Sequence, residues 1–190
     1  MDLATLHRLT VATWTRHVDA VRPDQWDQPT PCAEWDVRAL VNHVVGEDRW
    51  TVPLMRGATI TEVGDSLDGD LLGEQPVRSA DSAADEAVSV VAEALPGGAK
   101  VHLSYGDEEP GEYVSQLAAD HLVHAWDLAA AIGADRTLDP ALVEEVGAWF
   151  ADREALYRSG GAIAERVEGG EDAQSRMLGS FGRSAAWTAR

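Results

Sequence analysis

The chain has 190 residues, of which 45% are apolar and 25% charged, a composition typical of a single globular domain, here over residues 1–190, with a hydrophobic core. Its formal net charge is −18, from 33 acidic and 15 basic residues, so charge repulsion disfavours a nucleic acid or an acidic membrane as partner. No apolar run approaches the roughly 18 residues of a membrane span, and the N-terminus does not resemble a signal peptide. We therefore expect a cytoplasmic protein that binds a small molecule, a metal ion or another protein.

The first third of the chain is predicted to form two helices joined by a loop. Apolar residues recur at helical spacing over 2–21, which predicts the first helix. The stretch 22–35 contains three prolines and no periodicity, so we expect an ordered loop there. Asp36 then begins a second helix that ends around 56–57, and Pro53 is expected to kink or fray its last turn because proline lacks a backbone donor.

The rest of the chain is predicted to alternate between helices and Gly- or Pro-rich breaks. The expected elements are a long loop over 58–78, a helix over 79–95, a short extended segment over 100–105, a long helix from about Pro110 to Gly133, a helix over 140–158, a Gly-rich flexible stretch over 159–171 and a short helix over 172–181. Long helices with little strand indicate an all-α fold, an antiparallel four-helix bundle with a short extra C-terminal helix and minor extended segments.

Two polar side chains lie in the middle of the apolar face of the helix that begins near Pro110. On a helical wheel, Asp120 and His124 fall within about 60° of Leu117, and His121 falls within about 40° of it. Asp120 and His124 are also four residues apart, which stacks them on neighbouring turns. A buried carboxylate and imidazole lose their hydration, and a shared metal ion would compensate for that loss.

The second helix contains the same kind of anomaly. His43 shares a side of this helix with Leu40 and Val44, so it also points toward the interior. His43, Asp120 and His124 would form a set of two histidines and one carboxylate with open coordination positions, which is typical of catalytic zinc sites and also suits ferrous iron or nickel. The alternative is a buried ion pair beside a core histidine that bonds to a backbone carbonyl, and spacing alone leaves both open.

Three segments carry a recognisable pattern: WDQPTPCAEWDVRALVNHVVGEDRW (26–50), LVHAWDLAAAIG (122–133) and RMLGSFGRSAAW (176–187). They resemble the DinB/YfiT-like metalloenzyme superfamily, in particular the branch related to the N-terminal domain of mycothiol-dependent maleylpyruvate isomerase. The first combines a T-P-C-x-x-W loop with a helix whose histidine follows eight residues after the tryptophan. The resemblance covers most of the chain and is weakest in 58–105 and 155–175.

The resemblance implies a four-helix bundle that holds a divalent metal, often zinc or nickel, through three side chains. By motif position, the first metal-binding histidine of the superfamily corresponds to His43, and the histidine of H-x-x-D-L corresponds to His124. The residue four before it, a glutamate in the isomerase, corresponds to Asp120. Because aspartate is one methylene shorter, His121 stays open as an alternative third ligand, since several members use three histidines.

Other residues are candidates for supporting roles. Glu47, one turn beyond His43, is the candidate catalytic residue as a general base on a metal-bound water; alternatively it is an extra ligand or a partly exposed carboxylate at the rim. Asp127 could accept a hydrogen bond from a ligand histidine or cap a neighbouring helix. The single cysteine, Cys32, allows no internal disulfide and is expected to be a small buried hydrophobe rather than a reactive thiol. Core or pocket-wall positions are expected for Trp26, Trp35, Trp50 and Trp126.

The function implied by the resemblance is that of a thiol-dependent transferase or isomerase-like enzyme. In such relatives the metal binds the sulfur of a low-molecular-weight thiol, such as mycothiol or bacillithiol, and the thiolate attacks an electrophilic substrate. We therefore expect a divalent metal cofactor (zinc first, nickel or iron as alternatives), a mycothiol-type thiol and a small electrophile. Because the chain is expected to end without the further C-terminal domain of the isomerase, maleylpyruvate isomerisation itself is not expected. The alternative is a metal-binding module without turnover, whose metal seals a helix interface or a homodimer.

Overall fold

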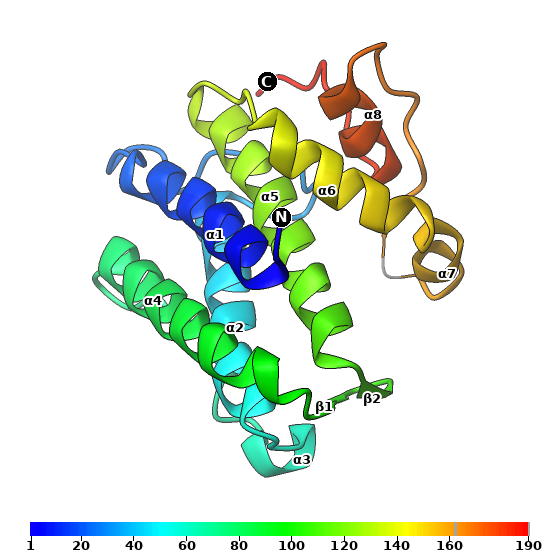
Figure 1. Cartoon of the computed structure of the whole chain (residues 1–190). Coiled ribbons are helices and arrows are strands. Elements are labelled where there is room, and N and C mark those ends of the chain that lie inside the picture. Colours follow the sequence, from blue (N-terminus) through cyan, green and yellow to red (C-terminus); the bar gives the residue numbers. More distant parts are fainter. Residues whose placement is uncertain (162, 190) are drawn as a thin grey trace.

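Most of the chain is helical in the computed structural model, which describes residues 1–161 and 163–189 (Figure 1). The elements are α1 (Leu3–Asp19), α2 (Val37–Met55), α3 (Ile60–Val63), α4 (Pro76–Ala94), a 3-10 turn (Leu95–Gly97), β1 (Val101–Leu103), β2 (Gly106–Glu108), α5 (Pro110–Ile132), α6 (Pro140–Ala151), α7 (Glu154–Ser159) and α8 (Ala173–Ser180). The two strands pair as a small antiparallel hairpin. The expected mostly helical fold with minor extended segments is confirmed.

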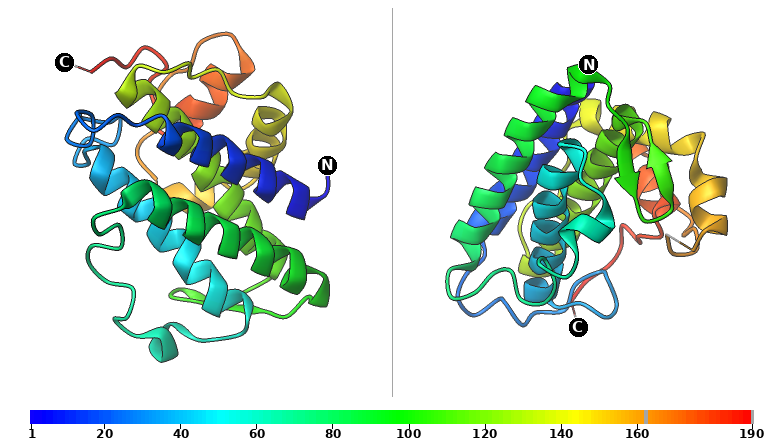
Figure 2. Two further views of the ribbon diagram at one scale, coloured as in Figure 1. Left: turned by 90° about the vertical axis from the view of Figure 1, so that its left-hand side faces the viewer. Right: turned by 90° about the horizontal axis from the view of Figure 1, so that it is seen from below.

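Helices α1, α2, α4 and α5 form the predicted four-helix bundle. Both α1 and α2 pack against α4 on one side and α5 on the other. The bundle core contains buried apolar side chains from all four helices, including Trp14, Leu40, Ala83 and Leu128. Helix α6 packs on α5 and α8, so the C-terminal helices gather on the side of α5 away from α4 (Figures 1 and 2). Helix α5 is therefore shared between the bundle and the C-terminal helices.

The two helices that carry the predicted metal ligands begin and end at local signals. Asp36 precedes α2, and its side chain accepts a hydrogen bond from the backbone N–H of Ala39 at 2.8 Å, which caps the helix. Pro110 is the first residue of α5, where a missing N–H costs nothing. Helix α5 ends at Gly133, whose φ of 70° is left-handed and favours glycine.

Two predictions of element boundaries are wrong. The stretch 58–78 contains α3, which is only four residues long and begins with a capping box formed by Thr59 and Glu62. It also contains the first turn of α4, which starts at Pro76 because proline is well tolerated there. The single helix expected over 140–158 is interrupted, so α6 ends at Ala151 and α7 begins at Glu154.

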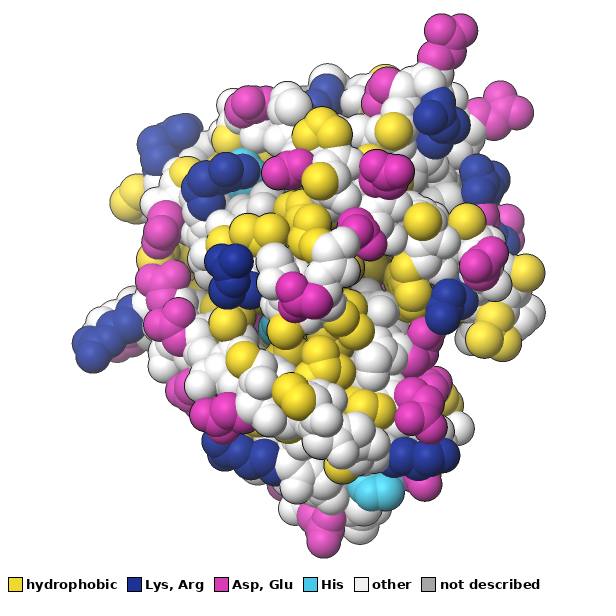
Figure 3. Space-filling view, in the orientation of Figure 1, with side chains coloured by type: hydrophobic (Ala, Val, Ile, Leu, Met, Phe, Trp, Pro, Cys, Tyr) yellow, Lys and Arg dark blue, Asp and Glu magenta, His cyan; other side chains and the backbone are white. Residues whose placement is uncertain are grey.

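Charged side chains surround a more hydrophobic area on one face of the molecule. Figure 3 shows hydrophobic side chains gathered toward the middle of one face, with acidic and basic side chains around them. Acidic residues outnumber basic ones, in agreement with the net charge of −18. Among the described residues, no helix has both the length and the apolar character that a membrane crossing needs.

Candidate metal centre

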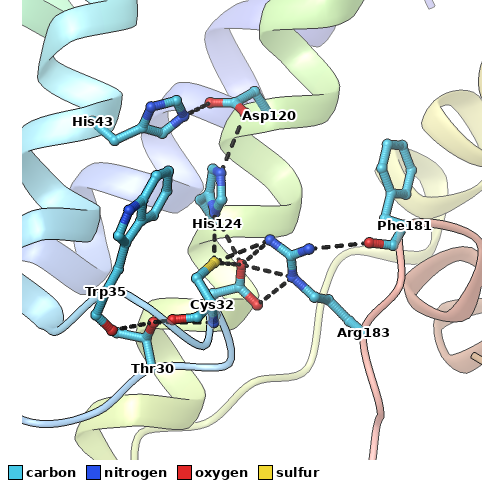
Figure 4. Close-up of polar contacts among 9 residues, drawn as sticks. Thr30, Cys32, Trp35, His43, Asp120, His124, Phe181 and Arg183 are labelled. Carbon is cyan, nitrogen blue, oxygen red and sulfur yellow. Dashed lines mark hydrogen bonds and ion pairs between the residues drawn. The ribbon is translucent and has the colours of Figure 1, made fainter. Parts of the chain in front are cut away.

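Helices α2 and α5 bring the three predicted ligand side chains together (Figure 4). His43 comes from α2, while Asp120 and His124 come from successive turns of α5. The Oδ2 atom of Asp120 lies 3.6 Å from Nε2 of His43, and its Oδ1 atom lies 3.3 Å from Nε2 of His124. One nitrogen of each ring and one carboxylate oxygen all lie within 4.8 Å of one another. Side chains from distant parts of the sequence thus form one cluster, which we call the open cluster.

The open cluster fits a divalent cation. Oδ2 of Asp120 is buried, and no hydrogen-bond partner for it exists among the residues that the structure describes. A buried polar atom left in this way costs about 1–3 kcal/mol of stability, and a bound cation would remove that cost. Two imidazoles and one carboxylate are the donor set of many catalytic zinc sites, and they also suit ferrous iron or nickel.

The loop before α2 covers one side of the open cluster. The ring of Trp35 lies 4.7 Å from the ring of His43 and 6.0 Å from the ring of His124, measured between centroids. The loop is closed by Thr30, whose hydroxyl donates to the backbone oxygen of Trp35 at 2.8 Å. Trp35 is therefore a wall of the site, one of the two positions expected for it.

His124 is oriented by a carboxylate on the side away from the open cluster. Its Nδ1 atom lies 2.9 Å from Oδ2 of Asp127, which is fully buried and can only accept a hydrogen bond when ionised. Nδ1 therefore carries a proton, and Nε2 is the nitrogen that faces Asp120. The same carboxylate is paired with the guanidinium of Arg183 from the C-terminal segment, with Nη2 to Oδ2 at 3.0 Å. Asp127 thus accepts a hydrogen bond from Nδ1 of His124, which is the contact expected for the first of its two predicted roles.

Neighbouring charges dominate the titration of His124 and Asp120. Burial alone would lower the pKa of His124, but the carboxylates of Asp120 and Asp127 outweigh burial and raise this pKa well above its usual range. Burial would similarly raise the pKa of Asp120, yet His124 and His43 hold it well below its usual range. The metal-free protein therefore contains an imidazolium–carboxylate pair, and a cation that binds Nε2 of His124 must displace a proton.

A cavity of about 310 Å³ opens beside the cluster. Its polar side includes His43, Glu47, Asp120 and His124, and its apolar side includes Trp149, Phe150, Tyr157 and Phe181. Burial and the neighbouring charge of Asp120 raise the pKa of Glu47, so this carboxyl binds protons more readily than an ordinary glutamate. A carboxyl of this kind, facing a cavity beside a candidate metal site, is suited to proton transfer.

Comparison with known proteins places the chain in a family. A family model described as the mycothiol maleylpyruvate isomerase N-terminal domain matches residues 7–129, more than half of the chain. The chain belongs to this family. The matched region contains the whole open cluster and Asp127, whereas Arg183 lies beyond it.

Relatives and a solved structure agree with this membership. Two uncharacterized proteins of Mycobacterium tuberculosis, from strains CDC 1551 / Oshkosh and ATCC 25618 / H37Rv, are each 36% identical over 152 residues, which is 76% of this chain and 75% of the relative. The crystal structure of a mutant of mycothiol-dependent maleylpyruvate isomerase matches with a TM-score of 0.64 and 16% identity, over 88% of this chain and 75% of that chain. At that identity the likeness concerns the fold alone, and it confirms the DinB/YfiT-like bundle.

His121, the alternative third ligand, lies outside the open cluster in this member of the mycothiol maleylpyruvate isomerase N-terminal domain family. Its Nε2 atom lies 3.1 Å from Oδ1 of Asp48 on α2, and its Nδ1 atom lies 2.8 Å from the backbone oxygen of Leu117. Burial would lower the pKa of His121, but the charge of Asp48 outweighs burial and raises it. His121 and Asp48 form a buried ion pair, which we call the closed pair. The helical wheel gave the correct face for His121 but not its partner.

A second group of metal-ligand type lies next to His124. Atoms of Cys32, His124 and Asp127 also lie within 4.8 Å of one another. In this group the guanidinium of Arg183 already occupies the place of a cation. Its Nη2 atom lies 3.1 Å from Sγ of Cys32 and 3.0 Å from Oδ2 of Asp127. Cys32 packs against the bundle core but is half-buried rather than buried, and its thiol donates to Oδ2 of Asp127 at 3.4 Å, so the expected small buried hydrophobe is found only in part.

Two residues were not predicted from the sequence: Arg183, which supports the site, and Asp48, which pairs with His121 outside it. Arg183 belongs to RMLGSFGRSAAW, one of the three segments of the family resemblance, so a signal was present although no role was assigned. Asp48 directly follows Glu47 on α2 and showed no pattern of its own, because its partner His121 comes from a distant helix.

Proposed function

We propose that this chain is a metal-dependent enzyme of small-molecule thiol chemistry, a thiol-dependent transferase or isomerase-like enzyme that acts on a small electrophile. His43, Asp120 and His124 would hold the divalent ion, with zinc expected first and nickel or iron as alternatives. The observation that carries the proposal is the open cluster itself, which combines a three-donor set with an adjoining cavity that contains Glu47. A purely structural metal site would instead be closed by a fourth protein ligand.

Glu47 in the cavity and Asp127 behind His124 each have a role in this proposal. A divalent ion, when bound, favours the deprotonated and nucleophilic form of a thiol. Glu47 would accept the proton that the thiol loses, because its raised pKa makes it a stronger base than an ordinary glutamate. Asp127 would hold the proton on Nδ1 of His124, so that Nε2 is the nitrogen that loses its proton when the ion binds.

The choice of thiol rests on the relatives. The family is named for a domain of mycothiol maleylpyruvate isomerase, and the matching crystal structure is that of a mycothiol-dependent enzyme. We therefore propose a mycothiol-type thiol as cosubstrate of this chain. The acidic surface makes a nucleic acid a poor partner, which also favours a small-molecule function.

Elemental analysis tests the metal site first. Protein purified without added metal is expected to contain about one divalent ion per chain, and His43→Ala and His124→Ala are each expected to lose it, because two protein ligands rarely retain such an ion. His102→Ala is the matched control, since His102 lies on the distant hairpin and pairs with Asp107. Equal metal content in all four proteins would refute the site.

Thiol titration then separates the enzyme from the alternative, a metal-binding or dimerising module without turnover. The metal-loaded protein is titrated with mycothiol, bacillithiol and glutathione and followed by calorimetry. An enzyme of the proposed kind should bind one of these thiols saturably and lose that binding when the metal is chelated. A module should show only a lower melting temperature after chelation and no thiol binding.

A further inference from the structure

The apolar lining of the cavity includes four aromatic rings that lie beyond the family-matched region, which ends at residue 129. Trp149 and Phe150 come from α6, Tyr157 comes from α7, and Phe181 follows α8. The rings of Phe150 and Phe181 are stacked with centroids 3.9 Å apart, and the rings of Trp149 and Tyr157 meet edge to face at 5.9 Å. We call these four side chains the aromatic wall.

The aromatic wall is held in place by an ionic network that the proposed metal chemistry does not use. Glu112 of α5 accepts hydrogen bonds from Nε1 of Trp149 at 3.2 Å and from the hydroxyl of Tyr157 at 3.5 Å. Arg153, in the break between α6 and α7, donates through Nε to both oxygens of Glu112 at 2.7 and 2.8 Å. Its guanidinium also lies over the ring of Trp149, 5.4 Å from the centroid. These contacts fix two ring orientations before any ligand binds, which reduces the entropy that binding costs.

The charges around the cavity disfavour an anion against this wall. Arg183 is the one arginine or lysine among the lining residues that the structure describes, and all three of its guanidinium nitrogens are already engaged. Its Nε and Nη2 atoms bind Asp127 at 3.1 and 3.0 Å, and its Nη1 atom binds the backbone oxygen of Phe181 at 3.0 Å. No pair of parallel N–H groups remains for the two-point binding by which arginine recognises a carboxylate. Glu47 and Asp120 also line the cavity and are acidic. The positive charge of His124 is already paired with Asp120 and Asp127.

We propose that the electrophilic substrate of this site carries an uncharged aromatic or planar conjugated group, which packs against the aromatic wall while its reacting end faces the open cluster. This inference rests on the proposed function, because it assumes that the cavity is a substrate site. The cavity of about 310 Å³ lies at the small end of the range for ligand pockets. It therefore suits a group of one or two rings.

A matched pair of ligands tests the proposal. Naphthalene-2-carboxamide and naphthalene-2-carboxylate have nearly the same size and shape and differ in charge, and both are titrated by calorimetry into metal-free and metal-loaded protein. We expect the carboxamide to bind both forms and to bind the metal-free form at least about tenfold more tightly than the carboxylate does, because like charge and unpaired desolvation oppose the anion. A carboxylate that binds the metal-free protein as tightly as the carboxamide, or no binding of either ligand, would overturn the proposal.

Three variants locate the bound ring. Trp149→Leu and Tyr157→Leu are each expected to weaken carboxamide binding by about 2- to 10-fold, the range for loss of one aromatic contact. Trp50→Leu is the matched control, because Trp50 is also partly buried but packs in the cluster near β1 and does not line the cavity. If all three variants bind like the unmodified protein, the group does not lie on the wall. Tyr157→Leu keeps the test valid if Trp149→Leu fails to fold.

Failure of the proposed ligand class and failure of the proposed function give different experimental results. Carboxamide binding to the metal-free protein requires the aromatic wall but neither a metal nor a thiol. If elemental analysis finds no metal and the carboxamide still binds at the wall, the metal chemistry fails while the ligand class stands. If metal and thiol both bind and the carboxamide does not, the function stands and the ligand class fails.

Discussion

Helices α2 and α5 hold two histidine–carboxylate groups that differ in their surroundings. The open cluster borders the cavity, and the side chains of His43 and Asp120 are 28% and 29% exposed. The closed pair, His121 and Asp48, is 0% and 1% exposed and does not line the cavity. Each group leaves one carboxylate oxygen without a partner among the described residues, so an unpaired oxygen alone does not distinguish them. The second histidine and the adjoining space make the open cluster a candidate ligand site, while the closed pair joins two helices.

The largest difference between the two groups should appear in stability. His121→Leu leaves the Asp48 carboxylate buried without its positive partner, which typically costs about 3–5 kcal/mol of the free energy of unfolding. His43→Leu removes a partly exposed side chain and should cost less than about 1 kcal/mol in the metal-free protein. Urea denaturation of the metal-free proteins measures both values.

A double variant controls for packing. Replacing both partners, Asp48→Leu with His121→Leu, should recover a large part of the loss, because a buried ion pair replaced by apolar side chains often costs little. Equal destabilisation by His43→Leu and His121→Leu would contradict the distinction between the open cluster and the closed pair.

The next largest expected effect is a loss of metal affinity when Asp127, which bonds to His124 of the open cluster, is changed. Asp127→Asn keeps a hydrogen-bond acceptor for Nδ1 of His124 but removes the charge, and loss of such an outer partner typically weakens metal affinity by about 10- to 100-fold. Competition with a chromogenic chelator measures the affinity. Asp172→Asn, at the exposed cap of α8, is the matched control and should leave the affinity unchanged. An unchanged affinity in Asp127→Asn would show that Asp127 does not act through His124.

The loss of stability at acidic pH should come in part from His7, a buried histidine of α1 that lies near the closed pair. Burial, aided by the charge of His121, lowers the pKa of His7 from 6.5 to about 3. The unfolded chain therefore binds a proton at this position as pH falls below 6.5, whereas the folded protein does not until about pH 3. The free energy of unfolding should fall in this window by up to about 1.4 kcal/mol per pH unit.

His7→Leu should reduce this slope, as measured by urea denaturation at several pH values between 6.5 and 4. His102→Leu removes an exposed histidine instead and should leave the slope nearly as it is. The assignment fails if both variants have the same pH dependence as the unmodified protein.

The smallest expected effect is a loss of stability when the start of helix α2, which carries residues of both groups, is changed. Asp36→Ala removes the side-chain cap of α2 and should cost about 1 kcal/mol of stability. Metal affinity should stay the same, since the folded geometry of the ligands does not depend on the cap. Denaturation and chelator competition on the same variant check both statements. A loss of affinity as large as that of Asp127→Asn would show that the open cluster depends on the start of α2.

The fold was largely predictable because its signals are local. Pro110 and Gly133 bound α5, and Asp36 caps α2, as expected from their side-chain and backbone preferences. The break between α6 and α7 was not predictable, because no proline or glycine marks it. There Arg153 turns back onto Glu112, and this contact involves residues 41 positions apart.

The sequence predicted the set His43, Asp120 and His124 that the structure brings together, but not the partners of His121 and Asp127. Helical periodicity placed Asp120, His121 and His124 on the inner face of α5, and the structure agrees. Which of them meets His43 depends on how α2 and α5 are placed against each other, and a shift of one residue, about 100° on the wheel, separates the open cluster from the closed pair. Arg183 was missed for the same reason, since its partner Asp127 lies 56 residues away.

The open cluster also has a consequence for how much of this protein is folded. Its donors come from helices separated in the sequence by α3, α4 and the β hairpin, so an unfolded chain does not offer this arrangement. A metal ion that binds it would select the native bundle, and an ion present at 100 times its dissociation constant would add about 2.7 kcal/mol to the free energy of unfolding. Scarcity of the ion would then lower the abundance of the protein in the cell by leaving more of it open to proteolysis.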